Sequence, residues 1–300
     1  MRTVNISEQS LLDFMILRSK VYYDLMKFRL SALVTFSAVF GFILGDSGVV
    51  FSWPGFIGLM IGGFLISGAS GAANEILERD LDKVMKRTQN RPLPLNLISL
   101  KEAYWFTGSV AVLGIAVLWI FTNPLTTVLG IVSMILYVFV YTPLKKVGPI
   151  AVFVGAIPGA MPPLLGWTAA TGSISYEALI IFGIQFIWQF PHFWAIAWVS
   201  DEDYKRAGFK LLPSGGGKDL NTAIQIMIYT LFLLPLGLLP TYFGFTGINS
   251  GIVATICGVL FLAQTFSLMR DFSHRSALKI MFGSFLYLPI VQIAYLLDKI

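Results

Sequence analysis

The sequence predicts an all-α membrane protein with nine transmembrane helices. The chain has 300 residues, of which 56% are hydrophobic and 12% are charged, and its mean hydropathy is +0.76. A soluble domain of this size carries about twice that charged fraction. Apolar runs long enough to cross ~30 Å of hydrocarbon, which takes roughly 20 helical residues, recur along the chain. The runs are continuous, whereas a transmembrane β-barrel would show alternating segments of ~10 residues.

Each apolar run is interpreted as one membrane-spanning helix. The runs lie near residues 25–45, 54–76, 103–122, 125–142, 149–169, 177–199, 222–242, 248–269 and 279–297. Prolines interrupt the fourth and fifth runs, so the helix ends there are the least sharply defined. Residues 1–24 are mixed and polar and lack the features of a signal peptide. We expect them to form a short cytosolic helix before a single transmembrane domain over residues 25–300.

The placement of Lys and Arg predicts the orientation. Twenty of the 21 basic residues precede the first run or lie in alternate connections, and only Lys299 lies on the other side. Because positive charge marks the cytoplasmic side, the amino terminus and these connections are predicted to lie on the cytoplasmic side of a bacterial cytoplasmic membrane. The net charge of +5 follows from this bias and from contact with lipid headgroups, and no feature of nucleic-acid binding accompanies it.

Polar side chains gather where the second run ends. Asn74, Glu78 and Asp82 follow one another at four-residue steps. On a helix that advances about 100° per residue they drift by only about 80°, so they form one stripe, and Asp80 points away from it. Basic residues follow directly in the segment "DKVMKRTQNRPLP".

These acids and bases together predict a diphosphate site bridged by a metal. Mg²⁺ is commonly held by one or two carboxylates together with phosphate oxygens and water, while nearby Lys and Arg side chains bind the phosphates. The alternative interpretation is a solvated helix end with ion pairs between successive turns.

A second acidic segment follows the sixth run, "WVSDEDYKRAGFKLLP". Asp82 and Asp203 lie 121 residues apart, each just past an even-numbered run, which predicts a repeat of four helices. Two such helix ends that face each other could form a two-metal diphosphate site. Further polar groups are predicted on the same inner face, namely Lys27, Arg29, Tyr141 and Lys145.

The first segment resembles the UbiA superfamily of intramembrane prenyltransferases. In that superfamily an Asn and two Asp stand at four-residue spacing, and the pattern "KRT-x-x-RP" follows. The corresponding residues here are Asn74, Glu78 and Asp82, followed by "KRTQNRP". Glu78 departs from the usual Asp. The resemblance covers nearly the whole chain and implies a UbiA-type helix bundle. It also implies catalytic Mg²⁺ ligands at Asn74, Glu78, Asp82 and Asp203. The diphosphate-binding residues that it implies are Arg29, Lys83, Arg87, Arg91, Tyr141, Lys145 and Lys210.

The segment "QFPHFWAIAWVSDEDYKRAGFKLLP" is similar to the subgroup of that superfamily that farnesylates protohaem. This similarity implies farnesyl diphosphate and haem B as substrates and haem O as the product, on the route to haem A and terminal oxidases. It implies haem contacts by His192 and Gln189. Haem A synthase or an oxidase assembly protein is the protein partner implied.

Two points stay open at this stage. Gln185, Gln189, His192 and Asp203 would lie within about 60° of one another on a regular helix, which predicts a cavity lining, but His192 could instead be a hydrogen-bond partner between helices. The function could also be prenylation of an aromatic acid or quinone precursor, or transport. Transport would require charge near the middle of the membrane, whereas here the acids lie at helix ends.

Overall fold

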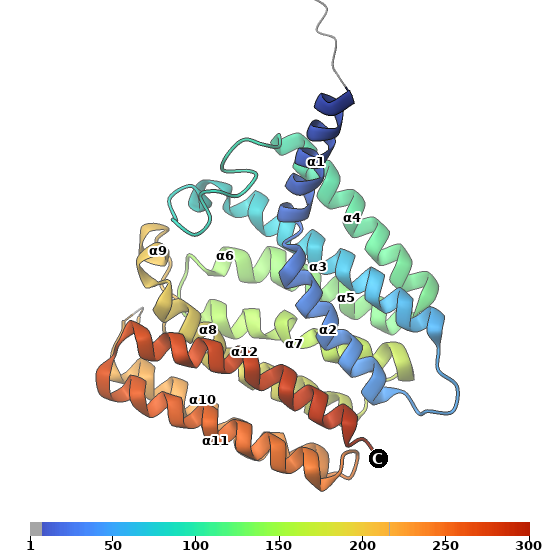
Figure 1. Ribbon diagram of the computed structural model, residues 1–300, viewed down its shortest axis with the longest axis vertical. Helices are drawn as coiled ribbons and strands as arrows, with labels where there is room; N and C mark the ends of the chain where they lie inside the picture. Colours follow the sequence, from blue (N-terminus) through green and yellow to red (C-terminus); the bar gives the residue numbers. More distant parts are fainter. Residues whose placement is uncertain (1–7, 216) are drawn as a thin grey trace, which may run out of the picture.

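The computed structural model describes residues 8–215 and 217–300 (Figure 1). Within these ranges nine helical segments are long and apolar enough to cross a membrane, which confirms the predicted class and number. They are α2 (Phe28–Gly45), α3 (Trp53–Asp82), α4 (Leu100–Phe121), the continuous segment Pro124–Leu144, α7 (Ile150–Thr171), α8 (Tyr176–Val199), α10 (Leu220–Tyr242), α11 (Ile248–Asp271) and α12 (His274–Leu297). Two further helices, α1 (Glu8–Leu25) and α9 (Asp201–Arg206), are not spans.

Several spans begin at a polar residue that caps the helix. The side chain of Ser52 accepts a hydrogen bond from the backbone N–H of Gly55 at the start of α3. Such a side chain satisfies a backbone donor that has no partner within the first turn. The other helices with this type of cap are α4 (Ser99), α5 (Asn123), α10 (Asp219) and α12 (Ser273).

The prolines in the fourth and fifth spans do not end the helices. The fourth span runs from α5 (Pro124–Ile135) through a π-helical turn, η1 (Leu136–Tyr141), into α6 (Thr142–Leu144). The α7 helix is continuous through its prolines, and side chains of other helices bind two of the carbonyls that those prolines leave free. Ser133 donates to the carbonyl of Pro158, and Gln185 donates to that of Gly159, at 3.4 and 2.9 Å. These two carbonyls lie four residues before Pro162 and Pro163.

Close packing through glycines joins α2 to α7. A Cβ atom on Gly41 would lie 2.0 Å from the carbonyl oxygen of Pro163, and one on Gly166 would lie 1.8 Å from that of Ala38. Small residues of this kind let the backbones of membrane helices approach each other. On its other side α2 packs on α3, and α3 packs on α4. The α8 helix packs on α7, α10 and α12, which completes the bundle in Figure 1.

Separate segments come together at the carboxyl-terminal end of α3. The α3 helix has 30 residues and ends at Asp82, close to α6 and to the loop over residues 83–99. The expected helix before the first span is α1, which begins at Glu8; residues 1–7 lie outside the described ranges. Arg18 and Tyr22 of α1 both hydrogen-bond Glu102 of α4, so α1 is tied to the bundle. The four-helix repeat and the cytosolic position of residues 1–24 stay predictions.

Candidate active site

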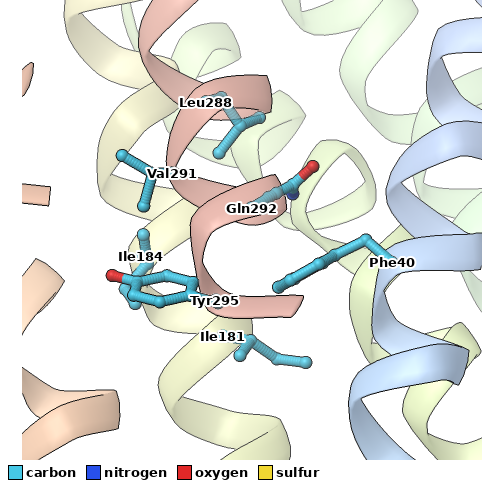
Figure 2. A pocket seen from close by; sticks show the side chains of 7 residues that line it. All are labelled: Phe40, Ile181, Ile184, Leu288, Val291, Gln292 and Tyr295. Atoms are coloured by element: carbon cyan, nitrogen blue, oxygen red, sulfur yellow. The ribbon is translucent and has the colours of Figure 1, made fainter. Parts of the chain in front are cut away.

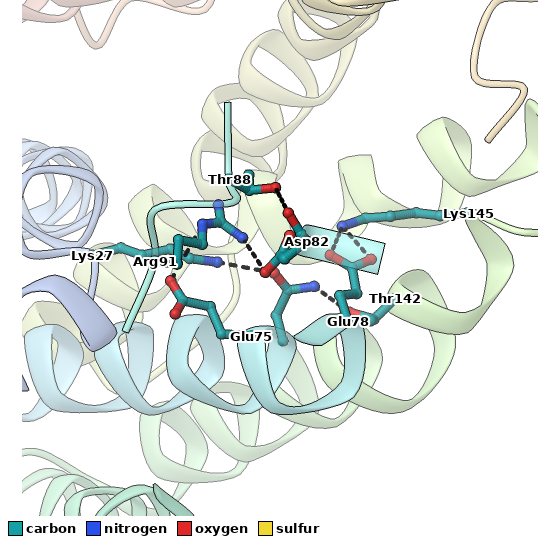
Figure 3. A network of polar contacts seen from close by, with 9 residues as sticks. Lys27, Glu75, Glu78, Asp82, Thr88, Arg91, Thr142 and Lys145 are labelled. Carbon is teal, nitrogen blue, oxygen red and sulfur yellow. Dashed lines mark hydrogen bonds and ion pairs between the residues drawn. The ribbon is translucent and has the colours of Figure 1, made fainter. Parts of the chain in front are cut away.

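Four polar side chains are buried near the carboxyl-terminal end of α3 (Figure 3). Asn74, Glu75, Glu78 and Asp82 have between 0% and 5% of their surface exposed. A buried carboxylate is costly unless a cation or several hydrogen bonds compensate it. Three cations from three other segments supply this compensation. The predicted polar stripe is therefore real, but it lies inside the protein and not on a solvated helix end.

Arg91 pairs with two of these carboxylates. Its Nη1 atom lies 2.8 Å from Asp82 Oδ2, and its Nε atom lies 3.6 Å from Glu75 Oε1. Burial acts to lower the pKa of Arg91, but the charges of Asp82 and Glu75 outweigh it and raise the pKa. The loop that carries Arg91 is held against α3 because Thr88 Oγ1 donates to the backbone oxygen of Asp82 at 3.0 Å. Arg91 is therefore charged and fixed in position.

Lys145, just past α6, pairs with Glu78. Its Nζ atom lies 2.9 Å from Oε1 and 3.0 Å from Oε2 of that carboxylate. The ammonium also lies 4.8 Å from the centre of the Tyr141 ring, a cation–π contact. Gly155 of α7 makes room for this ring, since a Cβ atom there would lie 2.6 Å from it. The structure thus brings Tyr141 and Lys145 to the acids of α3, as the sequence predicted.

Lys27 completes the cluster from the turn between α1 and α2. Its Nζ atom donates to Asn74 Oδ1 at 2.9 Å, and Asn74 Nδ2 donates to Thr142 Oγ1 at 3.2 Å. Lys27 adopts a left-handed backbone conformation with φ of 49°, which turns the chain from α1 into α2. Burial, followed by the charge of Arg91, lowers the pKa of Lys27 to about 8. Its charge therefore depends on pH near neutrality.

Asp203 joins α9 to the loop over residues 83–99. Its two carboxylate oxygens accept the backbone N–H groups of Lys86 and Arg87 at 3.0 and 3.1 Å, and Arg206 lies 3.3 Å away. The expectation that Asp203 continues the α8 helix is wrong. That helix ends at Val199, and Asp203 belongs to the separate helix α9, because the backbone leaves the helical conformation at Ser200. A metal contact by Asp203 stays a prediction.

The other predicted diphosphate residues lie outside the buried cluster. Arg29, Lys83, Arg87 and Lys210 are exposed. Lys83 pairs with Asp80 at 3.1 Å, and the Arg87 guanidinium lies 5.9 Å from the centre of the Tyr204 ring. Their part in phosphate binding stays a prediction.

The donor atoms of the cluster suit a Mg²⁺ ion that is shared with a phosphate ligand. Within the described residues no group of three or more His, Cys, Asp or Glu side chains could hold a metal ion by itself. However, Asp82 Oδ1 is buried and has no hydrogen-bond partner, and Glu78 and the Asn74 amide lie on the same stripe. Two carboxylates and an amide oxygen leave coordination positions for phosphate and water, as Mg²⁺ requires. The predicted ligands of α3 therefore fit the ion.

The polar stripe of α8 contacts neighbouring helices. Gln189 Nε2 donates to the backbone oxygen of Ala156 at 2.9 Å, and His192 Nδ1 lies 2.8 Å from Ser284 Oγ. Gln185 Nε2 donates to the backbone oxygen of Gly159, as described above. Each of these three side chains is therefore hydrogen-bonded to α7 or α12, and the predicted cavity lining and haem contacts stay predictions.

A small apolar cavity lies between α2, α8 and α12 (Figure 2). Its volume is about 10 Å³, which is close to the minimum for one water molecule. Gln292 stands at its edge, and its Nε2 atom donates to Gln185 Oε1 at 3.0 Å and to Ser37 Oγ at 3.2 Å. The residues that line it are Phe40, Ile181, Ile184, Leu288, Val291, Gln292 and Tyr295. An isoprenoid chain could enter here only if side chains moved.

Glu75 is the site residue that the sequence interpretation missed. Steps of four residues from Asn74 lead to Glu78 and Asp82 and pass over Glu75. Glu75 lies seven residues before Asp82, and seven residues on a helix return to within about 20° of the same direction. This spacing was the available signal.

Comparison with known proteins places the chain in a family. The sequence profile of the UbiA prenyltransferase family matches residues 34–288. A protoheme IX farnesyltransferase of Cytophaga hutchinsonii is 50% identical over 281 residues, which cover 94% of this chain and 98% of that protein. A protoheme IX farnesyltransferase of Christiangramia forsetii is 45% identical over 283 residues, 93% of each chain.

Solved structures share the fold. A structure described as that of digeranylgeranylglyceryl phosphate synthase superposes with a TM-score of 0.77 at 19% identity, over 93% of this chain and 97% of that one. A UbiA homologue from Archaeoglobus fulgidus bound to GPP and Mg²⁺ superposes with a TM-score of 0.62 at 17% identity, over 92% of this chain and 99% of that one. At these identities the similarity establishes the UbiA-type fold.

Proposed function

Since the chain belongs to the UbiA prenyltransferase family, we propose that it transfers a farnesyl group from farnesyl diphosphate to a vinyl group of haem B, giving haem O. The observation that carries the proposal is the buried cluster of three carboxylates, one amide and three cations near the carboxyl-terminal end of α3. The names of the similar proteins from Cytophaga hutchinsonii and Christiangramia forsetii support haem as the acceptor.

The cluster is suited to a metal diphosphate because its charges can exchange partners. In the structure Arg91 pairs with Asp82, and Lys145 pairs with Glu78. A diphosphate would attract the two cations, and the two carboxylates would then be free to hold Mg²⁺ together with Asn74. In this arrangement the acids bind the metal and the bases bind the phosphates. Asp203 of α9, Arg29 of α2 and the exposed residues Lys83, Arg87 and Lys210 are proposed to complete the site around the cluster.

The first step of the reaction is cleavage of the bond between the allylic carbon and the diphosphate oxygen. The chemistry that a bound Mg²⁺ supplies is Lewis acidity toward the departing diphosphate. Arg91, Lys145 and Lys27 stabilise the negative charge that grows on the phosphate oxygens, and burial strengthens this effect. Tyr141 positions Lys145 by its cation–π contact. The apolar interior excludes bulk water from the allylic cation.

In the second step a haem vinyl carbon forms a bond to the allylic carbon. Water then adds to the other vinyl carbon and releases a proton, which completes the hydroxyethylfarnesyl group. The vinyl group is the nucleophile in this scheme, so the protein needs no activated Ser or Cys side chain.

His192 is proposed to contact the haem. Ser284 donates its hydroxyl hydrogen to the backbone oxygen of Met281 at 2.6 Å. The Ser284 oxygen must therefore accept from His192 Nδ1, which leaves Nε2 unprotonated and able to bind iron or accept a hydrogen bond. Gln189, three residues earlier, is proposed as a second contact. A purely structural bond between α8 and α12 is the competing interpretation of His192.

The chain is proposed to lie in a bacterial cytoplasmic membrane with this site on the cytoplasmic side. The distribution of Lys and Arg residues supports the orientation. Haem A synthase or an oxidase assembly protein is proposed as the partner that receives the product, and co-purification from membranes tests this.

An acceptor comparison tests the function. Purified protein is incubated with Mg²⁺ and farnesyl diphosphate, together with either haem B or 4-hydroxybenzoate, and the products are identified by mass spectrometry. The proposal predicts haem O from haem B and no prenylated benzoate. Prenylation of the benzoate alone would show that the acceptor is an aromatic acid, and no transfer to either acceptor would favour transport.

A further inference from the structure

Glu75 has no role in the reaction described above, although it is among the most deeply buried charged groups of the protein. Only 1% of its surface is exposed, and it lies next to Asn74 on α3. We propose that Glu75 is a positioning residue that keeps Arg91 in place when Asp82 releases it to bind the metal. This inference rests on the proposed function, because it assumes that Asp82 exchanges Arg91 for a metal ion.

The contacts of Arg91 divide between two parts of its guanidinium. Asp82 faces Nη1 at 2.8 Å, whereas Glu75 faces Nε at 3.6 Å. The guanidinium is planar and rigid, with five N–H donors in fixed directions. When Asp82 turns to a metal, Nη1 becomes available to a phosphate oxygen, and the Glu75 contact at Nε need not change. Glu75 can therefore hold Arg91 throughout binding.

The charges of the cluster point to the same role. Three cations, Lys27, Arg91 and Lys145, are matched by three carboxylates. If Glu78 and Asp82 bind the metal, Glu75 is the one carboxylate of the three left to balance Arg91. Glu75 Oε2 is buried without a hydrogen-bond partner, so the carboxylate does not have a full set of partners of its own. Such a group is expensive to keep in a protein interior unless it stabilises a neighbouring charge.

The test is the variant Glu75→Gln, which keeps the size of the side chain and removes its charge. We expect the dissociation constant for inorganic pyrophosphate with Mg²⁺ and the KM for farnesyl diphosphate to rise by roughly 10- to 100-fold, as is typical for residues that orient a binding group. The kcat should change less than the KM, because the contact with Arg91 is already made in the ground state. The matched control is Glu202→Gln, which removes an exposed carboxylate from α9 and should leave both constants unchanged.

A double-mutant cycle with Arg91→Gln separates positioning from a general structural effect. If Glu75 acts through Arg91, the double variant should bind pyrophosphate about as weakly as Arg91→Gln alone. If the losses of pyrophosphate affinity in the two single variants multiply in the double variant, the proposal is overturned. An unchanged pyrophosphate affinity in a folded Glu75→Gln protein would also overturn it. If Glu75→Gln does not fold, Glu75→Asp replaces it in the same cycle, because it keeps the charge and withdraws the carboxylate by one methylene.

Pyrophosphate binding also separates this inference from the proposed function. The binding measurement involves no acceptor. The unmodified protein could bind pyrophosphate with Mg²⁺ and yet fail to farnesylate haem B. That result would contradict haem B as the proposed acceptor, and the double-mutant cycle alone would then support or overturn the role of Glu75.

Discussion

Replacement of Asp82 by Asn tests the metal site with little change in shape. Asp82 is fully buried, and its Oδ2 atom accepts from Arg91 Nη1 at 2.8 Å. Asn keeps the volume and one oxygen acceptor, so no cavity forms. The change weakens one hydrogen bond between charged groups, which contributes roughly 1.5–3 kcal/mol. We therefore expect a folded protein that is less stable by an amount of that order.

The effect of Asp82→Asn on transfer should be much larger than its effect on stability. Loss of residues that merely orient a metal ligand costs roughly 10- to 100-fold, so loss of a ligand carboxylate should reduce kcat/KM by at least about 100-fold. Farnesyl transfer is measured at increasing Mg²⁺ concentrations, and thermal unfolding is followed in parallel. Asp80→Asn is the control, since that side chain is 70% exposed and, among the residues that the structure describes, pairs with Lys83 and Arg79 only. Turnover of Asp82→Asn within about threefold of the unmodified protein, at the same Mg²⁺ dependence, would refute the reasoning.

Three further predictions follow from single contacts. Because burial lowers the pKa of Lys27 to about 8, Lys27 is charged below that pH, and kcat/KM for farnesyl diphosphate should fall as the pH rises through about 8. Bound diphosphate raises this pKa, so kcat should fall only at higher pH. The variant Lys27→Arg should remove the decline in kcat/KM, and an unchanged pH profile in that variant would exclude Lys27 as its source. The variant Gly166→Ala places a Cβ atom 1.8 Å from the Ala38 carbonyl oxygen and should lower the free energy of unfolding by about 1–3 kcal/mol or more. The control Gly63→Ala should not, because nothing lies within 4 Å of a Cβ atom there. Equal thermal stability of the two variants would contradict the close packing of α2 and α7. His192→Gln should weaken haem B binding in an optical titration without weakening pyrophosphate binding, and an unchanged haem affinity would restrict His192 to its bond with α12.

The spans could be predicted because hydrophobicity alone determines which segments can lie in lipid. The effect of the prolines on the helices could not be predicted, because it depends on side chains that are distant in the sequence. Pro162 and Pro163 leave two carbonyls without helical donors, and Ser133 and Gln185 supply donors from other helices. Nothing near these prolines in the sequence indicates that compensation.

The candidate site was predictable where its spacing is helical and local. Asn74, Glu78 and Asp82 share one helix, so their common direction follows from its periodicity. Asp203 lies outside the helical stripe because α8 ends at Val199 and the backbone changes direction at Ser200, which periodicity alone does not indicate. The pairing of Arg91 with α3 depends on the path of a loop, which periodicity does not determine.

A structure of the protein with Mg²⁺ and a non-hydrolysable farnesyl thiodiphosphate tests most directly whether the acids and bases of the cluster exchange partners. The account predicts a metal ion at about 2.1 Å from oxygens of Glu78 and Asp82, with Arg91 Nη1 and Lys145 Nζ bound to phosphate oxygens. It also predicts that Glu75 still contacts Arg91. If the diphosphate instead lies on the exposed residues of the loops, and Arg91 and Lys145 remain on Asp82 and Glu78, the central claim is wrong.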